Sequence, residues 1–118
     1  MTFRDYLDEH HESRSLLEQL RRAIASLGPI EERESKSQVA FRRRRTFAVA
    51  WAPAQYLGAR GAPLVLSVVL PERDADPRWK EVVEPRPGVF MHHLELRVAD
   101  DIDGQAKEWI KRAYDAAQ

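Results

Sequence analysis

The sequence predicts an α+β fold: an antiparallel β-sheet of about five to six strands, with N-terminal and C-terminal helices packed on one face. Three observations support this class. Apolar residues recur at helical spacing near both ends of the chain, alternate with a period of two within residues 36–51, and occupy both alternating sets of positions in Leu64–Leu70. Because the connections are short, the strands are expected to run mostly as hairpins.

The length of the chain predicts one domain, residues 1–118, which is large enough to bury a core of its own. Cysteine is absent, which excludes disulfides and thiol nucleophiles. The 19 basic residues balance the 19 acidic ones, whereas domains that grip nucleic acid are usually basic overall. The N-terminus lacks the apolar core of a signal peptide, and no apolar run approaches the ~20 residues of a membrane span. We therefore expect a cytoplasmic protein with no membrane contact.

Two helices are expected before the sheet, over about residues 2–9 and 14–27. Thr2 is a suitable N-cap for the first helix and Ser13 for the second. The pair at 28–29, Gly-Pro, ends the second helix, because glycine supplies a C-terminal cap and proline cannot continue the helix. The apolar stripe of the second helix consists of Leu16, Leu17, Leu20, Ile24 and Leu27.

The sheet is expected over about residues 30–98. Its first segment, Ile30–Glu34, is charged, as an edge strand often is. Two strands then meet at the arginine run Arg42–Arg45, with Arg43 and Arg44 at the hairpin tip. Alternation predicts one core face and one second face for this hairpin. We expect the core face to carry Val39, Phe41, Phe47, Val49 and Trp51, and the second face to carry Ala40, Arg42, Ala48 and Ala50.

The run Leu64–Leu70 is apolar on both faces, which predicts a central strand whose second face needs cover from a helix, a loop or another subunit. Residues 52–63 are expected to form a loop, and residues 79–84 a short strand. A long strand follows over Val89–Val98, with His92 and His93 on opposite faces. The last helix is expected over about residues 101–117, capped by one of the aspartates at 100–101.

Several local patterns resemble those of a known family. They are Lys36-Ser-Gln-Val-Ala-Phe, the arginine run, Arg78-Trp-Lys, and Met91-His-His-Leu-Glu-Leu before the final helix. From about Leu16 to the C-terminus the chain resembles the domain-of-unknown-function family 5655, small bacterial and archaeal proteins without an assigned activity. The order of its elements is similar, more distantly, to that of YdhG-like and MmcQ/YjbR-like domains. The resemblance implies the fold and supplies no catalytic residues.

The arginine run is the first candidate binding site. Arginine binds phosphate or carboxylate through paired N–H groups, so Arg42, Arg44 and Arg45 are candidates for contacts with an anion. Arg42 stands out because small residues are expected beside it on the second face. The alternative is a solvated hairpin tip, which is what charge runs usually form. Its expected partners are Glu31, Glu32 and Glu34.

Three further residues are candidates for ligand contacts. His93 is expected on the second face, either beside Arg42 or as an ordinary surface histidine. Trp79 lies between two cations, so it is either a platform for a nucleobase or, more commonly, the anchor of a loop. Lys36 adds a positive charge before the hairpin. Because His92 and His93 point to opposite faces, they are not expected to bind one metal ion.

These observations lead to three functional hypotheses. The first is a non-catalytic binding or accessory module whose second face holds a small anion or a protein partner, including a second copy of the chain. The alternative is association with nucleic acid through Arg42–Arg45, Lys36 and Trp79, with binding that weakens as salt increases. The last is an enzyme with His92 or His93 as acid or base. No nucleophile–base–orienter set supports this last hypothesis, and we predict no catalytic residue, metal ion or cofactor.

Overall fold

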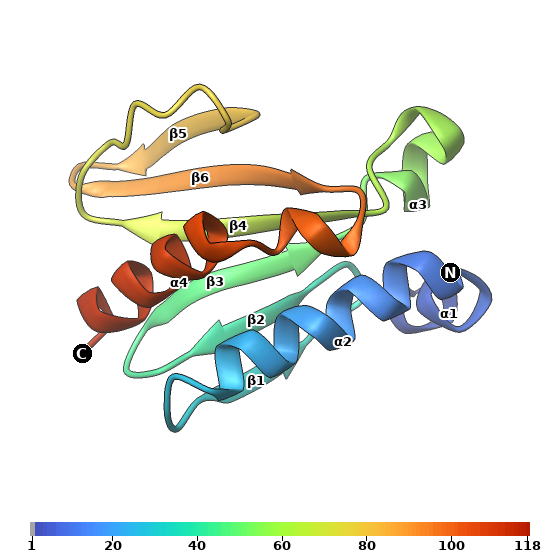
Figure 1. Ribbon diagram of the computed structural model, residues 1–118, viewed down its shortest axis with the longest axis horizontal. Helices are drawn as coiled ribbons and strands as arrows, with labels where there is room; N and C mark the ends of the chain where they lie inside the picture. Colours follow the sequence, from blue (N-terminus) through green and yellow to red (C-terminus); the bar gives the residue numbers. More distant parts are fainter. Residues whose placement is uncertain (1) are drawn as a thin grey trace.

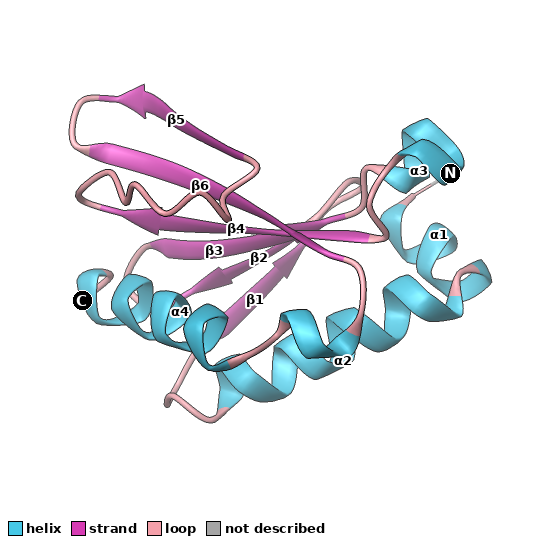
Figure 2. Cartoon of the chain, turned by 45° about the horizontal axis from the view of Figure 1, so that its top comes forward, coloured by secondary structure: helices cyan, strands magenta, loops and turns pink. Residues whose placement is uncertain are grey.

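The computed structural model describes residues 2–118 as an α+β structure of two layers, a sheet and a set of helices. Figures 1 and 2 show helices α1, α2 and α4 on one face of the sheet, so helices from both ends of the chain share that face, as predicted. The helices are α1 (Phe3–Glu9), α2 (His11–Ala25), α3 (Ala54–Leu57) and α4 (Gly104–Ala116), with 3₁₀ turns η1 (Gly58–Arg60) and η2 (Ala99–Asp101). Of the helices within the described residues, none has the length and apolarity required to cross a bilayer.

The sheet has six strands in the order β1-β2-β3-β4-β6-β5, and all neighbouring strands are antiparallel. The strands are β1 (Glu31–Glu34), β2 (Val39–Arg42), β3 (Thr46–Trp51), β4 (Leu64–Leu70), β5 (Glu81–Arg86) and β6 (Val89–Leu96). β4 lies between β3 and β6, which confirms that the apolar run forms a central strand. The charged strand β1 lies at one edge, also as predicted, and all four of its residues are exposed.

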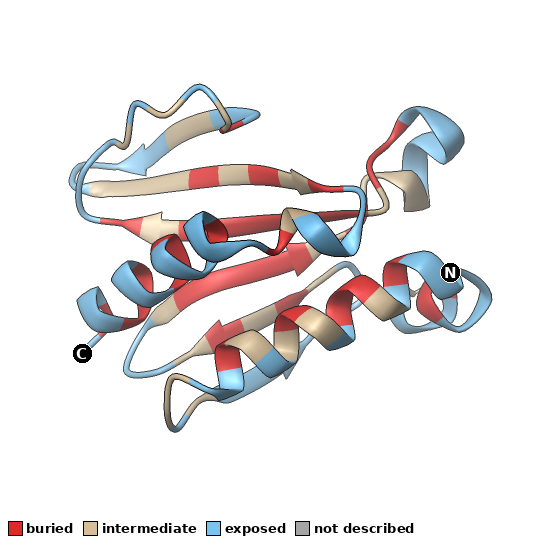
Figure 3. Cartoon of the chain, in the orientation of Figure 1, coloured by how far each residue is buried: buried red, intermediate tan, exposed pale blue. Residues whose placement is uncertain are grey.

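The core lies between the sheet and its helices. Figure 3 shows buried positions along β3 and β4 and along the sheet-facing sides of α2 and α4. Leu20 and Ile24 of α2 and Ile110 of α4 are at most 1% exposed, so the apolar stripes predicted for these helices are confirmed. Fully burying a side chain of this size stabilises the fold by ~1.5–3 kcal/mol.

The start of α2 differs from the prediction. The capping box of α1 at Thr2 and Asp5 is present, but α2 begins at His11 rather than at about residue 14. Ser13 lies inside α2, where it is 1% exposed and its Oγ donates to Tyr6 Oη at 3.4 Å. The break between α1 and α2 is at His10, three residues before Ser13. Ser13 therefore does not cap α2 and instead contributes to the contact between the two helices.

Two other boundaries were also wrong. Part of the predicted loop over residues 52–63 folds into α3 and η1. The last helix starts later than expected, because its N-cap is Asp103, whose carboxylate accepts from the N–H of Ala106 at 2.9 Å. Asp101 instead accepts from the N–H groups of Arg97 and Val98 through Oδ2 and closes the turn that precedes α4.

A β-bulge interrupts the alternation of the β2–β3 hairpin. Phe41 pairs with Ala48, but the next residue, Arg42, pairs with Thr46, so Phe47 is an extra residue on β3. Phe47 is fully buried and packs in the core beneath α4. A bulge of this kind bends the strand and increases its twist.

Phe47 lies in the core as predicted, but the predicted faces of residues 48–51 of β3 were wrong. Ala48 and Ala50 lie in the core on the helix face. Val49 and Trp51 lie on the opposite, second face, because they alternate with these alanines. The expected grouping of Arg42 with the two alanines does not occur. Residues 48–51 of β3 are all apolar and largely buried, so the sequence alternation did not reveal which set faces the helices.

Candidate anion-binding notch

β3 and β4 separate at one end of the sheet. Their ladder ends at the pair formed by Ala48 and Val68, although β3 extends back to Thr46 and β4 on to Leu70. Each strand stays paired on its other side, with β2 and β6 respectively. The bulge at Phe47 lies at this separation and bends β3. Figure 1 shows the two strands diverging here, with α4 lying across the gap.

The gap contains a hollow of about 570 Å³, which we call the notch. This volume lies within the range of small-molecule sites, ~300–1,000 Å³. The ends of β3 and β4 form its walls, alanines of α4 close it on the helix side, and the β5–β6 hairpin completes it. The residues lining the notch are Arg42, Arg45, Thr46, Phe47, Val69, Leu70, Pro71, Pro85, Arg86, Gly88, Val89, Met91, Ala113, Ala116 and Ala117.

Three arginines give the notch its charge. Arg42 is half-buried, and its Nε lies 4.0 Å from Glu31 Oε1, a long ion pair. Arg45 donates from Nη2 to the carbonyl oxygen of Ala116 at 2.6 Å. Arg86 is exposed, and its side chain has no hydrogen-bond or ion-pair partner among residues 2–118. None of the described residues that line the notch is acidic. The electrostatic potential in the notch therefore favours an anion.

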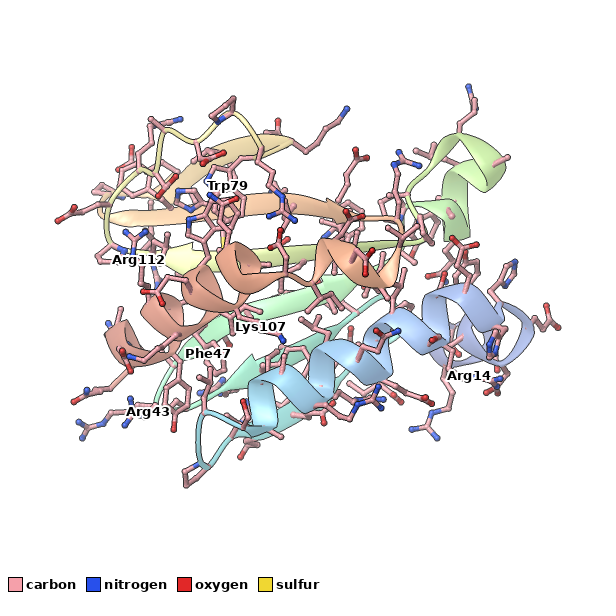
Figure 4. The ribbon with its side chains drawn as sticks, viewed as in Figure 1. Arg14, Arg43, Phe47, Trp79, Lys107 and Arg112 are labelled. Carbon is pink, nitrogen blue, oxygen red and sulfur yellow. The ribbon has the colours of Figure 1, made fainter. Side chains whose placement is uncertain are left out.

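The other members of the arginine run have different roles. Arg43 lies over the ring of Tyr114, 4.2 Å from its centroid, and donates to the Tyr114 carbonyl oxygen at 3.3 Å. Arg44 donates its main-chain N–H to Ala117 O at 3.1 Å, and its exposed side chain does not line the notch. Figure 4 shows Arg43 and Phe47 together at this end of the molecule. Part of the run therefore binds the C-terminal end of α4, which carries negative partial charge.

The expected glutamate partners of the run are mostly engaged elsewhere. Glu31 is near Arg42, but Glu32 binds Arg21 at 2.9 Å and Glu34 binds Arg4 at 3.0 Å. The arginine run is thus neither a fully solvated tip nor paired mainly with β1.

The architecture that contains this notch is that of a recognised family. A family model described as "Domain of unknown function (DUF5655)" matches residues 4–117. The chain belongs to the DUF5655 family. This match confirms the resemblance seen in the sequence patterns, whereas the likeness to YdhG-like and MmcQ/YjbR-like domains stays a prediction. No curated protein and no solved structure matches the chain significantly.

In this DUF5655 protein Trp79 is a loop anchor. It is 8% exposed, with its ring centroid 4.0 Å from that of Trp109 on α4 and 4.9 Å from that of His92. Its indole N–H donates to Asp74 Oδ1 at 3.1 Å. The ring is covered on this side by core residues, so it is not available as a platform for a nucleobase.

Ion pairs tie the connection between β4 and β5 to α4. Arg78 binds Asp103 at 2.9 Å, and Arg112 binds Asp74 at 3.2 Å. The N–H of Ala106 and the Arg78 guanidinium hold the pKa of Asp103 below its ordinary value. Burial acts to raise the pKa of Asp74, but hydrogen bonds from a main-chain N–H, an indole N–H and Arg112 outweigh it and lower that pKa. Both carboxylates therefore stabilise the fold in their ionised form.

His92 also holds this connection and is fully buried. Its Nε2 accepts from the N–H of Asp74 at 2.9 Å, and its Nδ1 lies 3.2 Å from Phe90 O, so the proton resides on Nδ1. Burial lowers the pKa of His92, although the carbonyl of Phe90 and the charge of Asp74 oppose this shift. With both ring nitrogens engaged, His92 cannot also exchange protons with a bound substrate.

His93 belongs to a separate polar cluster on the second face. Its Nδ1 lies 2.6 Å from Ser67 Oγ, which accepts from the Trp51 indole N–H at 3.2 Å. Burial lowers the pKa of His93, and the charge of Glu81 opposes this shift. His93 does not line the notch, although Met91, two residues earlier on the same face of β6, does.

The structure thus brings together two of the residues proposed from the sequence, Arg42 and Arg45. Lys36 lies in the β1–β2 turn, where its carbonyl accepts from Phe3 N–H at 2.6 Å, and this turn is at the opposite end of β2 from the arginine run. The residues proposed for nucleic-acid contact are therefore not assembled on one surface. Within the described residues, no group of three or more histidines, aspartates and glutamates converges as metal ligands.

Sequence reasoning missed Arg86 and the alanines of α4. The prolines and glycine of the segment at 85–88, Pro-Arg-Pro-Gly, indicate only a turn. Its position beside the arginine run depends on the strand order β4-β6-β5 and on the separation of β3 from β4. No local pattern in the sequence encodes either feature.

Proposed function

We propose that this protein is a non-catalytic binding module that holds a small amphipathic anion in the notch. The observation that carries the proposal is the combination of three arginines and an apolar lining in one hollow. The apolar body of the ligand lies against the side chains of Val69, Met91 and the α4 alanines. Its anionic group lies at the arginines, since the guanidinium fork matches carboxylate and phosphate oxygens.

The arrangement of the arginines suits a ligand that binds reversibly. Arg45 is already held by the α4 carbonyl at Ala116, so it contributes charge without reorganising. Arg86 has no side-chain partner within residues 2–118, and Arg42 has only the long contact with Glu31. These two side chains can therefore turn towards an anion without breaking a strong interaction.

Binding is proposed in preference to catalysis because neither His92 nor His93 lines the notch. The second face of the sheet is not covered by α1, α2 or α4 (Figure 2), and Trp51, Met91 and His93 are half-buried there. Self-association through this face stays a prediction.

The test uses octanoate as the probe and octanamide as its uncharged counterpart. Each is titrated into the purified protein, and binding is followed by NMR chemical shifts of main-chain amides. We expect octanoate to shift signals of residues that line the notch and octanamide to bind at least about tenfold more weakly, because a hydrogen bond to a charged group contributes ~1.5–3 kcal/mol.

A double variant, Arg42→Ala with Arg86→Ala, identifies the site. It is expected to weaken octanoate binding at least about tenfold. The matched control is Arg60→Ala, which removes an exposed arginine outside the notch and should leave the affinity unchanged. Equal binding of octanoate and octanamide, or equal loss in the control, would contradict the proposal.

A further inference from the structure

The walls of the notch are strand edges that lack a ladder partner. Thr46 and Phe47 of β3 and Val69 and Leu70 of β4 stand opposite each other beyond the last ladder pair, yet they do not pair across the gap. None of the main-chain hydrogen bonds formed outside the ladders within residues 2–118 involves these four residues. Unpaired strand edges of this kind are templates for another extended chain.

We infer that the natural occupant of the notch is an extended peptide segment that ends in a free α-carboxylate. This inference rests on the proposed function, since the α-carboxylate is the anion that the arginines hold. The peptide adds a short strand at the separated end of the sheet, a mode in which main-chain hydrogen bonds give affinity and side-chain pockets give specificity. An acyl chain would fill the apolar space but would leave the main-chain groups at the strand edges unpaired.

The dimensions of the notch limit the length of this strand. Each free edge is two residues long, and a strand rises ~3.3 Å per residue. The bound part of the peptide is therefore about two to three residues. Successive residues of a strand point to opposite faces, so one side chain points towards Ala113 and Ala116 and the next towards the second face near Met91.

Charge complementarity supports a terminal carboxylate as the recognised group. Arg42, Arg45 and Arg86 line the notch, and none of the described lining residues is acidic. The backbone of an internal peptide segment has no charge to offer them. A free C-terminus supplies two carboxylate oxygens at the end of an extended backbone, and a guanidinium binds both through parallel N–H groups.

The alanines of α4 set the expected specificity. Ala113 is 1% exposed and Ala117 4% exposed, and both line the notch without filling it. Their short side chains leave room for a small or medium apolar residue of the peptide, while a charged residue there would be desolvated without a partner. Peptides with Ala or Val at the inward position should therefore bind, and those with Asp should not.

The probe is the tetrapeptide acetyl-Val-Ala-Val-Ala with a free carboxylate, compared with its C-terminal amide and with octanoate by NMR titration. The free-acid peptide is expected to compete with octanoate, and the amide is expected to bind at least about tenfold more weakly. Single N-methylation at each amide in turn then tests strand pairing. Since both walls of the notch are unpaired strand edges, methylation of an amide in the last two to three residues should weaken binding, whereas methylation of the first Val, outside the bound part, should not.

The outcomes separate the two proposals. If octanoate binds and the free-acid peptide does not compete, the peptide inference is wrong while the anion-binding function stands. If neither binds, the proposed function fails as well. If the peptide binds but N-methylation has no effect, or has the same effect at every position, the strand-addition mode is wrong.

Discussion

His92 accepts a hydrogen bond from the main-chain N–H of Asp74 at 2.9 Å, and this contact fixes the connection between β4 and β5 to the sheet. The bond requires an unprotonated Nε2. Burial lowers the pKa of His92 below its ordinary value of 6.5, so the folded state resists the proton that the unfolded chain accepts. The stability that this histidine provides is therefore present above pH 6.5 and is lost as the pH falls through 6.5 towards the lower folded-state pKa.

The first prediction follows from this linkage. The free energy of unfolding, measured by urea denaturation, should fall between pH 7.5 and 5.5, and His92→Gln should flatten that dependence. Burial also lowers the pKa of His93, so His93→Gln should remove a further part of the pH dependence of the free energy of unfolding. A pH dependence that is unchanged in His92→Gln would show that His92 is not the group that titrates.

The second prediction concerns Phe47, which meets the Tyr114 ring edge-on with centroids 5.4 Å apart. Phe47→Ala should lower the free energy of unfolding by ~3–5 kcal/mol, because it leaves a cavity between the bulge and α4. The control is Tyr56→Ala, which truncates an aromatic residue that is 64% exposed and should change stability by no more than ~0.5 kcal/mol. A loss at Phe47 as small as that at Tyr56 would mean that the bulge does not hold Phe47 in the core.

The same residue shows where prediction from the sequence succeeds and where it ends. The run Leu64–Leu70, which is apolar on both faces apart from Ser67, identified the central strand because a strand flanked by neighbours on both sides buries nearly all of its side chains. The alternation around Phe47 was misleading, because a β-bulge reverses the faces of a strand and has no side-chain signature in this segment. The notch that depends on this bulge was therefore not predictable.

The arginines that line the candidate site were predictable only in part. A cluster containing Arg42 and Arg45 indicated anion binding, and both residues line the notch. Arg86 was missed because it reaches them through the pairing of β5 with β6, which is not a local property. For Trp79 the loop anchor was the commoner of two alternatives, and the buried ring has that role. The sequence could not decide between them, because a tryptophan with cations on both sides has the same pattern in a loop anchor and in a stacking platform.

The third prediction separates the members of the arginine run. Arg43→Ala removes the contact with the Tyr114 ring and a hydrogen bond at the end of α4, and should cost ~0.5–1 kcal/mol of stability. Arg44→Ala removes an exposed side chain without a hydrogen-bond or ion-pair partner among residues 2–118, and should change stability by less than ~0.5 kcal/mol. Urea denaturation of the two variants measures the difference. Equal losses would contradict the assignment of Arg43 as the side chain that stabilises α4.

The last prediction tests the notch by filling it. Ala116 is exposed and lines the notch, so Ala116→Leu should place a larger side chain in the hollow without disturbing the core. Octanoate binding should weaken at least about tenfold, because the apolar body of the ligand loses its space while the arginines remain. The matched control is Ala25→Leu, an equal change at an exposed position of α2 outside the notch, which should leave binding unchanged. Full binding by Ala116→Leu would show that the anion is held by the arginines alone and that the apolar lining plays no part in recognition.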